Sequence, residues 1–292
     1  MRGAVAVALL SVPAWANALD VGTALTADQV VSRNIAARGG MEAWAKVRTL
    51  VWVGHLQSLR ASVPSMPFVL EQKLPNKTRF ELNALNERTM RVFDGEQGWK
   101  VRQGRGGMPE TVPYSAQEVI YARQERALDG DVVDAALNGS AVALEGSDQV
   151  DGRTTYRLAI SSPSGDRHHV WIDAQTFLDV KSERNSYGAG GVARPVIIFY
   201  RDYKEIDGLM LPSSIETASA PGAPADKMVI ERVTVNAVLD DRMFMNPASD
   251  RARRRPTRDV GAGTGDVGPA AGSMSSSGAA SNNVSRADVE VR

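Results

Sequence analysis

The sequence predicts a mainly β protein, in which a large antiparallel sheet packs with a few helices. Most of the 292 residues fall into short stretches that alternate apolar and polar side chains, which is the pattern of strands with one buried face. Three Asp-Gly pairs, Asp94-Gly95, Asp151-Gly152 and Asp207-Gly208, separate such stretches. Asp-Gly favours tight hairpins because Gly adopts positive φ without strain and Asp tolerates it. Local pairing of this kind builds a meander, which is most stable when it curls toward closure.

A helix is expected at the start of the mature chain. Thr26 and Gln29 form a capping-box pattern. In this pattern the Thr26 hydroxyl accepts a hydrogen bond from the backbone amide of Gln29, and the Gln29 side chain accepts one from the backbone amide of Thr26. Positions Val30, Val31, Asn34, Ile35 and Arg38 form a modest stripe, and Gly39-Gly40 ends the helix. A second short helical turn over residues 41–46 presents Trp44. These helices either cover one end of the sheet or plug its open face.

Five strands follow, separated by short turns. We place them at residues 50–56, 68–74, 78–85, 89–93 and 98–102. Residues 104–113, which contain Gly-Arg-Gly-Gly-Met-Pro, are expected to form a loop.

The middle of the chain predicts two helices. Ser115 and Glu118 form a second capping box that opens a helix running to about residue 128. Asp131 is expected to cap a shorter helix over residues 132–137, ended by Asn138-Gly139. Helices that interrupt the strands at one place suit a flap across a sheet better than a separate domain.

The strands then resume. We place them at residues 141–149, 154–160, 167–172, 178–187, 194–203, 210–217 and 227–235.

Both ends of the chain differ from this pattern. Residues 1–18 resemble a secretory signal peptide: Arg2 precedes a short apolar stretch, Pro13 breaks it, and small residues suited to cleavage follow. A buried N-terminal helix is the alternative. Residues 248–292 are rich in Gly, Ser and Ala, and we expect them to be disordered. The cluster Arg251-Ala252-Arg253-Arg254-Arg255 is either a solvated tail or a contact for anionic lipid head groups.

The predicted organisation is therefore a signal peptide (1–18), one β domain (19–247) and a disordered tail (248–292). The chain has no cysteine, so it has neither disulfides nor thiolate chemistry. No later segment approaches the length of about 20 apolar residues that spans a bilayer. A soluble, monomeric protein of the bacterial periplasm fits these features best.

No catalytic or cofactor motif stands out. Net charge is zero, so the overall field does not indicate nucleic-acid binding. His168 and His169 are adjacent on a predicted strand and point to opposite faces, so they do not share a metal. Asp240-Asp241 is expected to begin a turn rather than form a catalytic pair. We predict no enzyme activity, no metal and no cofactor.

Large apolar side chains are abundant on the strand faces that we expect to point inward. If the helices fill the concave face incompletely, these side chains line a cavity for acyl chains. The predicted cavity residues are Trp52, Leu56, Phe68, Leu70, Phe80, Leu82, Met90, Trp99 and Ile120. Trp171, Ile198 and Leu211 share the pattern. The alternative for each is an ordinary core position.

Five segments resemble, in the same order, the LolA-like outer membrane lipoprotein-sorting protein family. They are Ala37-Arg38-Gly39-Gly40-Met41-Glu42-Ala43-Trp44, Leu70-Glu71-Gln72-Lys73-Leu74-Pro75-Asn76-Lys77, Phe93-Asp94-Gly95-Glu96-Gln97-Gly98-Trp99, Tyr203-Lys204-Glu205-Ile206-Asp207-Gly208-Leu209-Met210-Leu211-Pro212 and Leu239-Asp240-Asp241-Arg242-Met243-Phe244. The resemblance implies a half-open antiparallel β-barrel of about eleven strands, plugged by helices, around a hydrophobic cavity. In the family's lipoprotein carrier a strand arginine hydrogen-bonds the helical lid; Arg79 and Arg91 are candidates by strand position.

These features together suggest a periplasmic carrier, or chaperone, that binds lipid acyl chains or lipidated proteins and exchanges them with inner- and outer-membrane transport proteins. The first alternative is an envelope sensor or accessory module that binds a protein partner. The second is a hydrolase, which would require His168 or His169 beside an Asp or Ser in a pocket.

Overall fold

The computed structural model describes residues 25–248, except residues 60, 62, 86, 125–129, 164 and 188–192. The predicted signal peptide (1–18) and all but the first residue of the predicted tail (248–292) lie outside the described residues.

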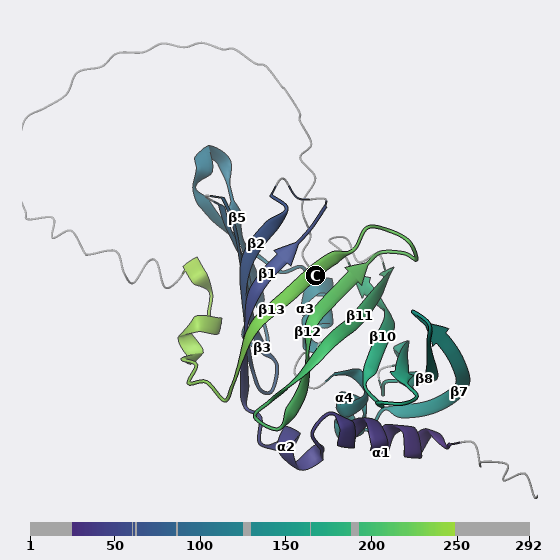
Figure 1. Cartoon of the computed structure of the whole chain (residues 1–292). Helices are drawn as coiled ribbons and strands as arrows, with labels where there is room; N and C mark the ends of the chain where they lie inside the picture. Colours follow the sequence, from purple (N-terminus) through teal and green to yellow (C-terminus); the bar gives the residue numbers. More distant parts are fainter. Residues whose placement is uncertain are drawn as a thin grey trace, which may run out of the picture.

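One antiparallel sheet of thirteen strands forms the described part of the chain, in the order β6-β5-β4-β3-β2-β1-β13-β12-β11-β10-β9-β8-β7. The strands span Thr49–Gln57 (β1), Ser65–Lys73 (β2), Lys77–Ala84 (β3), Glu87–Phe93 (β4), Gly98–Gln103 (β5), Pro109–Pro113 (β6), Ala141–Val150 (β7), Arg153–Ser161 (β8), Arg167–Asp173 (β9), Asp179–Tyr187 (β10), Ala193–Ile206 (β11), Leu209–Ala218 (β12) and Asp226–Val235 (β13). The sheet is bent and its edge strands β6 and β7 do not pair, so the barrel is open (Figure 1). The predicted half-open antiparallel barrel is confirmed.

Strand β6 accounts for part of the difference from the expected number of about eleven strands. The sequence predicted a loop over residues 104–113, but Pro109–Pro113 pairs with β5. Proline lacks an amide donor and is found in sheets mainly on edge strands, and β6 is an edge strand. The prolines therefore marked the edge of the sheet, not the absence of a strand.

The helices are Ala27–Ala37 (α1), Met41–Ala45 (α2), Ala116–Gln124 (α3) and Asp131–Asn138 (α4). Both predicted capping boxes are present, Thr26 with Gln29 and Ser115 with Glu118. The prediction that Asp131 caps α4 is wrong. Gly130 occupies the cap position without a side-chain hydrogen bond, and Asp131 is the first helical residue. None of the helices within the described ranges is long and apolar enough to cross a bilayer.

Two of the Asp-Gly turns adopt the conformation that the sequence predicts. Asp151 and Asp207 have φ of 50° and 51°, and the glycines that follow them have φ of 75° and 79°. Positive φ at both central residues matches the right-handed twist of the hairpins that they connect. The turns therefore fix the registers of β7–β8 and β11–β12.

The sheet has a concave face, covered by helices, and a convex face. Leu50 of β1 packs in the same cluster as Trp44 of α2 and Val133 of α4, which identifies the concave face. At the other end of the sheet, Val30 of α1 and Val132 of α4 pack on the same face of β8 and β9. Figure 1 shows α1 and α2 along the lower end of the sheet, with α3 and α4 behind it.

The helical end of the molecule is fixed to the β11–β12 hairpin. The amide of Met210 donates to the carbonyl oxygen of Arg38 at 3.1 Å. Gly39, with φ of 109°, lies so close that a Cβ atom there would be 2.2 Å from the carbonyl oxygen of Gly208. Only glycine permits both this conformation and this approach.

A C-terminal segment is fixed to β2 and β3. The short 3₁₀ turn Asp241–Phe244 (η2) begins after Asp240, whose carboxylate accepts from the Arg242 amide as the sequence predicts. Asp241 forms ion pairs with Lys73 and Lys77, at 2.8 and 3.2 Å, and Phe244 is fully buried. The five segments that carry the family resemblance thus include two pairs that contact each other.

Candidate ligand-binding site

An apolar wall covers the concave face of β1 to β3. Its buried members are Leu50, Trp52, Leu56, Met66, Phe68 and Leu82, and Leu70 and Phe80 pack against them half-buried. The strands alternate cleanly here: Trp52 pairs with Leu70, which in turn pairs with Phe80. The rings of Phe68 and Phe80 stack with centroids 5.9 Å apart. We refer to these eight residues as the apolar wall.

The structure divides the nine residues predicted to line the cavity. Trp52, Leu56, Phe68, Leu70, Phe80 and Leu82 all belong to the apolar wall.

Met90 and Trp99 lie on the opposite, convex face. In the register of β3 with β4, Phe80 pairs with Arg91, so the side chain of Met90 projects with that of its partner Glu81. Trp99 pairs with Val92, which is on the same convex face. Ile120 is on α3 and is 47% exposed. The assignment of Met90 and Trp99 to inward strand faces is therefore wrong.

Trp171, Ile198 and Leu211 were also predicted to lie on inward strand faces. Leu211 is buried against the apolar wall, and Ile198 is buried on the concave face of β11. Trp171 lies on the convex face instead, in a small cluster with Val150 and Val180.

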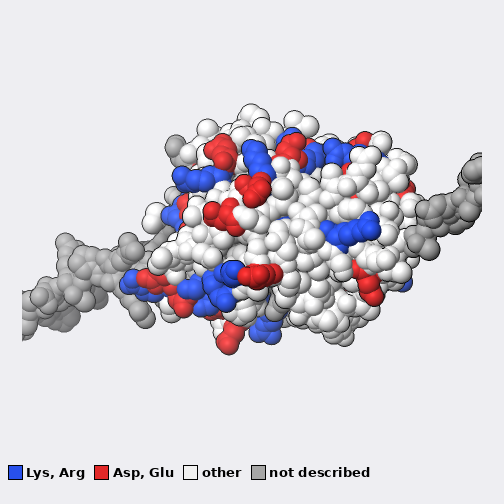
Figure 2. Space-filling view, turned by 60° about the horizontal axis from the view of Figure 1, so that its bottom comes forward, with Lys and Arg blue, Asp and Glu red and all other residues white. Residues whose placement is uncertain are grey.

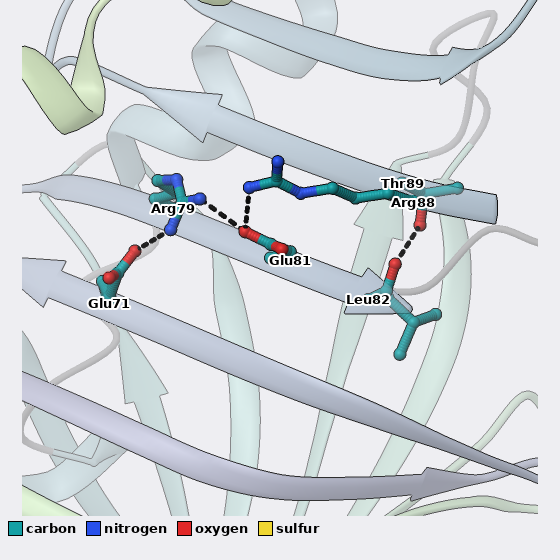
Figure 3. Close-up of polar contacts among 6 residues, drawn as sticks. All are labelled: Glu71, Arg79, Glu81, Leu82, Arg88 and Thr89. Atoms are coloured by element: carbon teal, nitrogen blue, oxygen red, sulfur yellow. Dashed lines mark hydrogen bonds and ion pairs between the residues drawn. The ribbon is translucent and has the colours of Figure 1, made fainter. Parts of the chain in front are cut away.

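A network of ion pairs occupies the convex face of β2 to β4 (Figure 3). Arg79 lies between Glu71 and Glu81 and pairs with both, and Arg88 reaches Glu81 at 2.5 Å. Burial alone would raise the pKa of Glu81, but the hydrogen bonds and charges of Arg88 and Arg79 lower it. Both ion pairs of Arg79 lie on the convex face of the sheet, so they do not connect this arginine to a helix.

Arg91, the other lid candidate, faces the helices. Its guanidinium is 3.6 Å from the carboxylate of Glu118 on α3. Lys100 of β5 approaches the same carboxylate at 2.8 Å, and the Ser115 amide donates to it at 2.9 Å. We call Glu118, Arg91 and Lys100 the latch.

The latch is the main buried attachment of α3. This helix bridges the two limbs of the half-barrel, with contacts to β5 and β10. Among the α3 side chains that the structure describes, only Glu118 is buried. Burial would raise the pKa of Glu118, but Lys100, Ser115 and Arg91 lower it overall, so the carboxylate is ionised at neutral pH. The one buried side chain of α3 among those described is therefore held by ionic contacts, and Arg123 adds a hydrogen bond to the carbonyl oxygen of Glu96.

The end of α1, in contrast, is held tightly. Arg38 forms a buried ion pair with Asp179 of β10 at 2.5 Å, and both side chains are at most 5% exposed. Its Nε donates to the carbonyl oxygen of Met210, and its guanidinium lies over Trp44. Breaking a buried pair of this kind is costly because it leaves an unpaired charge inside the protein. The C-terminal end of α1 is thus held by a buried ion pair, whereas the partners of Glu118 on α3 are 32% (Arg91) and 29% (Lys100) exposed.

A surface depression of about 330 Å³ lies beside α2. It is lined by Ala43, Lys46, Val47, Asp207, Leu209, Val235 and Asn236. None of these is a predicted cavity residue. On the face of the molecule that carries α1 and α2, positive and negative side chains are interspersed (Figure 2). This face presents no broad field of one sign.

The histidines and the candidate catalytic groups do not form a catalytic arrangement within the described residues. His168 and His169 project to opposite faces, as predicted, because they pair with Ile160 and Ala159. His168 Nε2 is 4.0 Å from Asp131, and Ser182 Oγ has no hydrogen-bond partner there, so no Ser–His pair forms. The described part of the chain also contains no group of three potential metal ligands.

Sequence reasoning missed the polar residues of the concave face. His168 of β9, Ser182 and Arg184 of β10, Tyr200 of β11 and Asp131 of α4 come together between α4 and the sheet. We call these five residues the polar strip. The available signal was the unbroken polar run over residues 181–186 of β10, in which Ser182 and Arg184 make the inward face polar as well.

Neither a protein-family model nor a curated protein matches the sequence. Solved structures are similar in fold. A DUF1329 family protein from Desulfovibrio piger is 12% identical and superposes with a TM-score of 0.51, covering 77% of this chain and 99% of that one. A LolA superfamily protein from Nitrosomonas europaea is 13% identical, with a TM-score of 0.46 and coverage of 76% and 98%. The chain thus shares its fold with the DUF1329 family protein, and this fold is the half-open antiparallel barrel that the sequence resemblance implied.

Proposed function

We propose that this protein is a periplasmic carrier that binds the acyl chains of lipids or lipidated proteins against the apolar wall. The observation that carries the proposal is the continuous apolar wall on the concave face of β1 to β3. In addition, α3 contacts both limbs of the half-barrel, and its one buried side chain among those described is the ionised Glu118 of the latch.

The energies favour such an exchange. Burying a methylene group is worth about 0.8 kcal/mol, so a long acyl chain contributes roughly 10 kcal/mol on burial. A charge-assisted hydrogen bond of the latch contributes only about 1.5–3 kcal/mol. The gross gain from burying an acyl chain therefore exceeds the loss of one latch contact, and the proposed binding requires no cofactor or catalytic group. Protein partners at the inner and outer membranes would set the direction of transfer.

A matched pair of variants tests the proposal. Phe80 and Met90 are half-buried neighbours on β3 and β4, but they project to opposite faces. Binding of a fluorescent acyl probe should weaken at least tenfold in Phe80→Gln, because the substitution places an amide in the apolar site. Met90→Gln should bind like the wild type.

Thermal unfolding of both variants checks that they are folded. Equal probe binding by the two variants, or no binding by the wild type, would contradict the carrier function and favour a module that binds a protein partner.

A further inference from the structure

The polar strip is part of the same concave face as the apolar wall. Ser182 of β10 pairs with Val170 of β9 on one side and Ile198 of β11 on the other. All three side chains therefore point toward the helices. The half-buried Ile215 of β12 and Met228 of β13 pack against the wall and lie between the wall and the strip. A molecule with an apolar and a polar end could span the two.

Two groups of the strip carry unused hydrogen-bonding capacity. Ser182 is completely buried, and its Oγ has no partner among the described residues. His168 Nε2 is likewise without a hydrogen bond there, since the Asp131 carboxylate is 4.0 Å away. Buried polar groups are nearly always hydrogen-bonded, so groups left in this state point to a ligand or bound water.

The charges around the strip are balanced. Tyr200 is faced by the carboxylates of Asp131 and Asp179 and by the guanidinium groups of Arg184 and Arg38. A ligand with a full charge of either sign would meet like charge and would lose its hydration.

Two titratable groups of the strip, Tyr200 and His168, remain uncharged. Burial raises the pKa of Tyr200, so its hydroxyl stays protonated and can both donate and accept. Burial lowers the pKa of His168, against the smaller effect of Asp131, so the imidazole is neutral at pH 7. Hydroxyl and neutral imidazole groups match an uncharged partner that both donates and accepts hydrogen bonds.

We infer that the polar strip binds the head of the ligand, and that this head is uncharged and bears hydroxyl groups, as in a glycerol ester. This inference rests on the proposed function, because the acyl chains of the same ligand occupy the apolar wall. The strip thereby selects among lipids whose chains are identical.

Displacement of a bound fluorescent acyl probe tests the inference. Monoolein, with a glycerol head, should displace the probe at a concentration at least tenfold lower than oleate, which has the same chain and a carboxylate. Tyr200→Phe and Ser182→Ala remove one hydroxyl each and should reduce this preference about three- to tenfold. Tyr156→Phe is the matched control, since Tyr156 is also on the concave face but stacks on Phe177 away from the strip. It should leave the preference unchanged.

Equal displacement by monoolein and oleate, or the same preference in Tyr200→Phe, Ser182→Ala and the wild type, would overturn the inference and leave the carrier function intact. Failure of the wild type to bind the acyl probe would overturn both. Both variants remove only a hydroxyl group, and their unfolding temperatures show whether the fold is retained.

Discussion

Single residues determine where the helices and the sheet meet. Gly39 is in contact with the backbone of the β11–β12 hairpin and adopts a φ of 109°. Gly40 also has a positive φ, of 86°, but a Cβ atom there would meet nothing within 4 Å. A side chain at Gly40 would meet only backbone strain, whereas a side chain at Gly39 would meet both strain and a steric clash.

This difference predicts the effect of alanine at each position. Gly40→Ala should lower the free energy of unfolding by about 1–3 kcal/mol through strain alone. Gly39→Ala should cost about 1–3 kcal/mol more, because its Cβ would overlap the carbonyl oxygen of Gly208. Urea unfolding of the two variants measures the difference. Equal losses would show that the close approach of these two backbones contributes nothing to stability.

The sequence allowed several residues to be placed correctly and others not. The predicted stripe of α1 was Val30, Val31, Asn34, Ile35 and Arg38. Val30, Asn34 and Arg38 are buried, and Val31 and Ile35 are half-buried. The face of Met90 could not be read from β4, because both faces of this strand carry apolar and charged side chains. Thr89, Arg91 and Phe93 project one way, and Arg88, Met90 and Val92 the other. Where neither face is uniformly polar, the pattern does not fix which face is inside.

The elements differ in how firmly they are attached. α1 is fixed by the buried pair of Arg38 and Asp179, whereas α3 depends on the ionised carboxylate of Glu118. The capping boxes that predicted both helices are local and say nothing of this difference. Lys100, Arg91 and Asp179 are distant from their partners in sequence, so the attachments are visible only in the folded chain.

The latch makes the attachment of α3 dependent on pH. The pKa of Glu118 is lowered in the folded protein, so the latch stabilises α3 above the ordinary pKa of a glutamate and is lost as pH falls through the lowered value. Acidification should therefore release α3 before the sheet unfolds. Limited proteolysis within residues 115–124, compared with tryptophan fluorescence of the sheet, follows the two events.

Glu118→Gln should show at neutral pH the proteolytic sensitivity that the wild type shows only in acid. Arg88→Gln is the control, because it removes an exposed partner of the convex-face network. Equal resistance of Glu118→Gln and the wild type at neutral pH would mean that the latch does not hold the helix.

At the scale of the whole molecule, the segments that resemble the LolA-like family contain residues that connect distant parts of the fold. Arg38 and Gly39 meet the β11–β12 hairpin, and Asp241 meets Lys73 and Lys77. Such residues specify how the sheet is assembled, which explains why the sequence predicted the fold so well. These five residues belong neither to the apolar wall nor to the polar strip, so they carry no information on the ligand. We propose that the ligand chemistry resides in the apolar wall and the polar strip, whose members are scattered over six strands and a helix of the described structure.

Native mass spectrometry of the protein purified from its source, followed by lipid extraction, tests the central claim most directly. A carrier should retain a molecule with one or more long acyl chains, and removal of this molecule should restore the uptake of an acyl probe. A purified protein that contains no lipid and takes up no probe would contradict the claim that the concave face is a binding site.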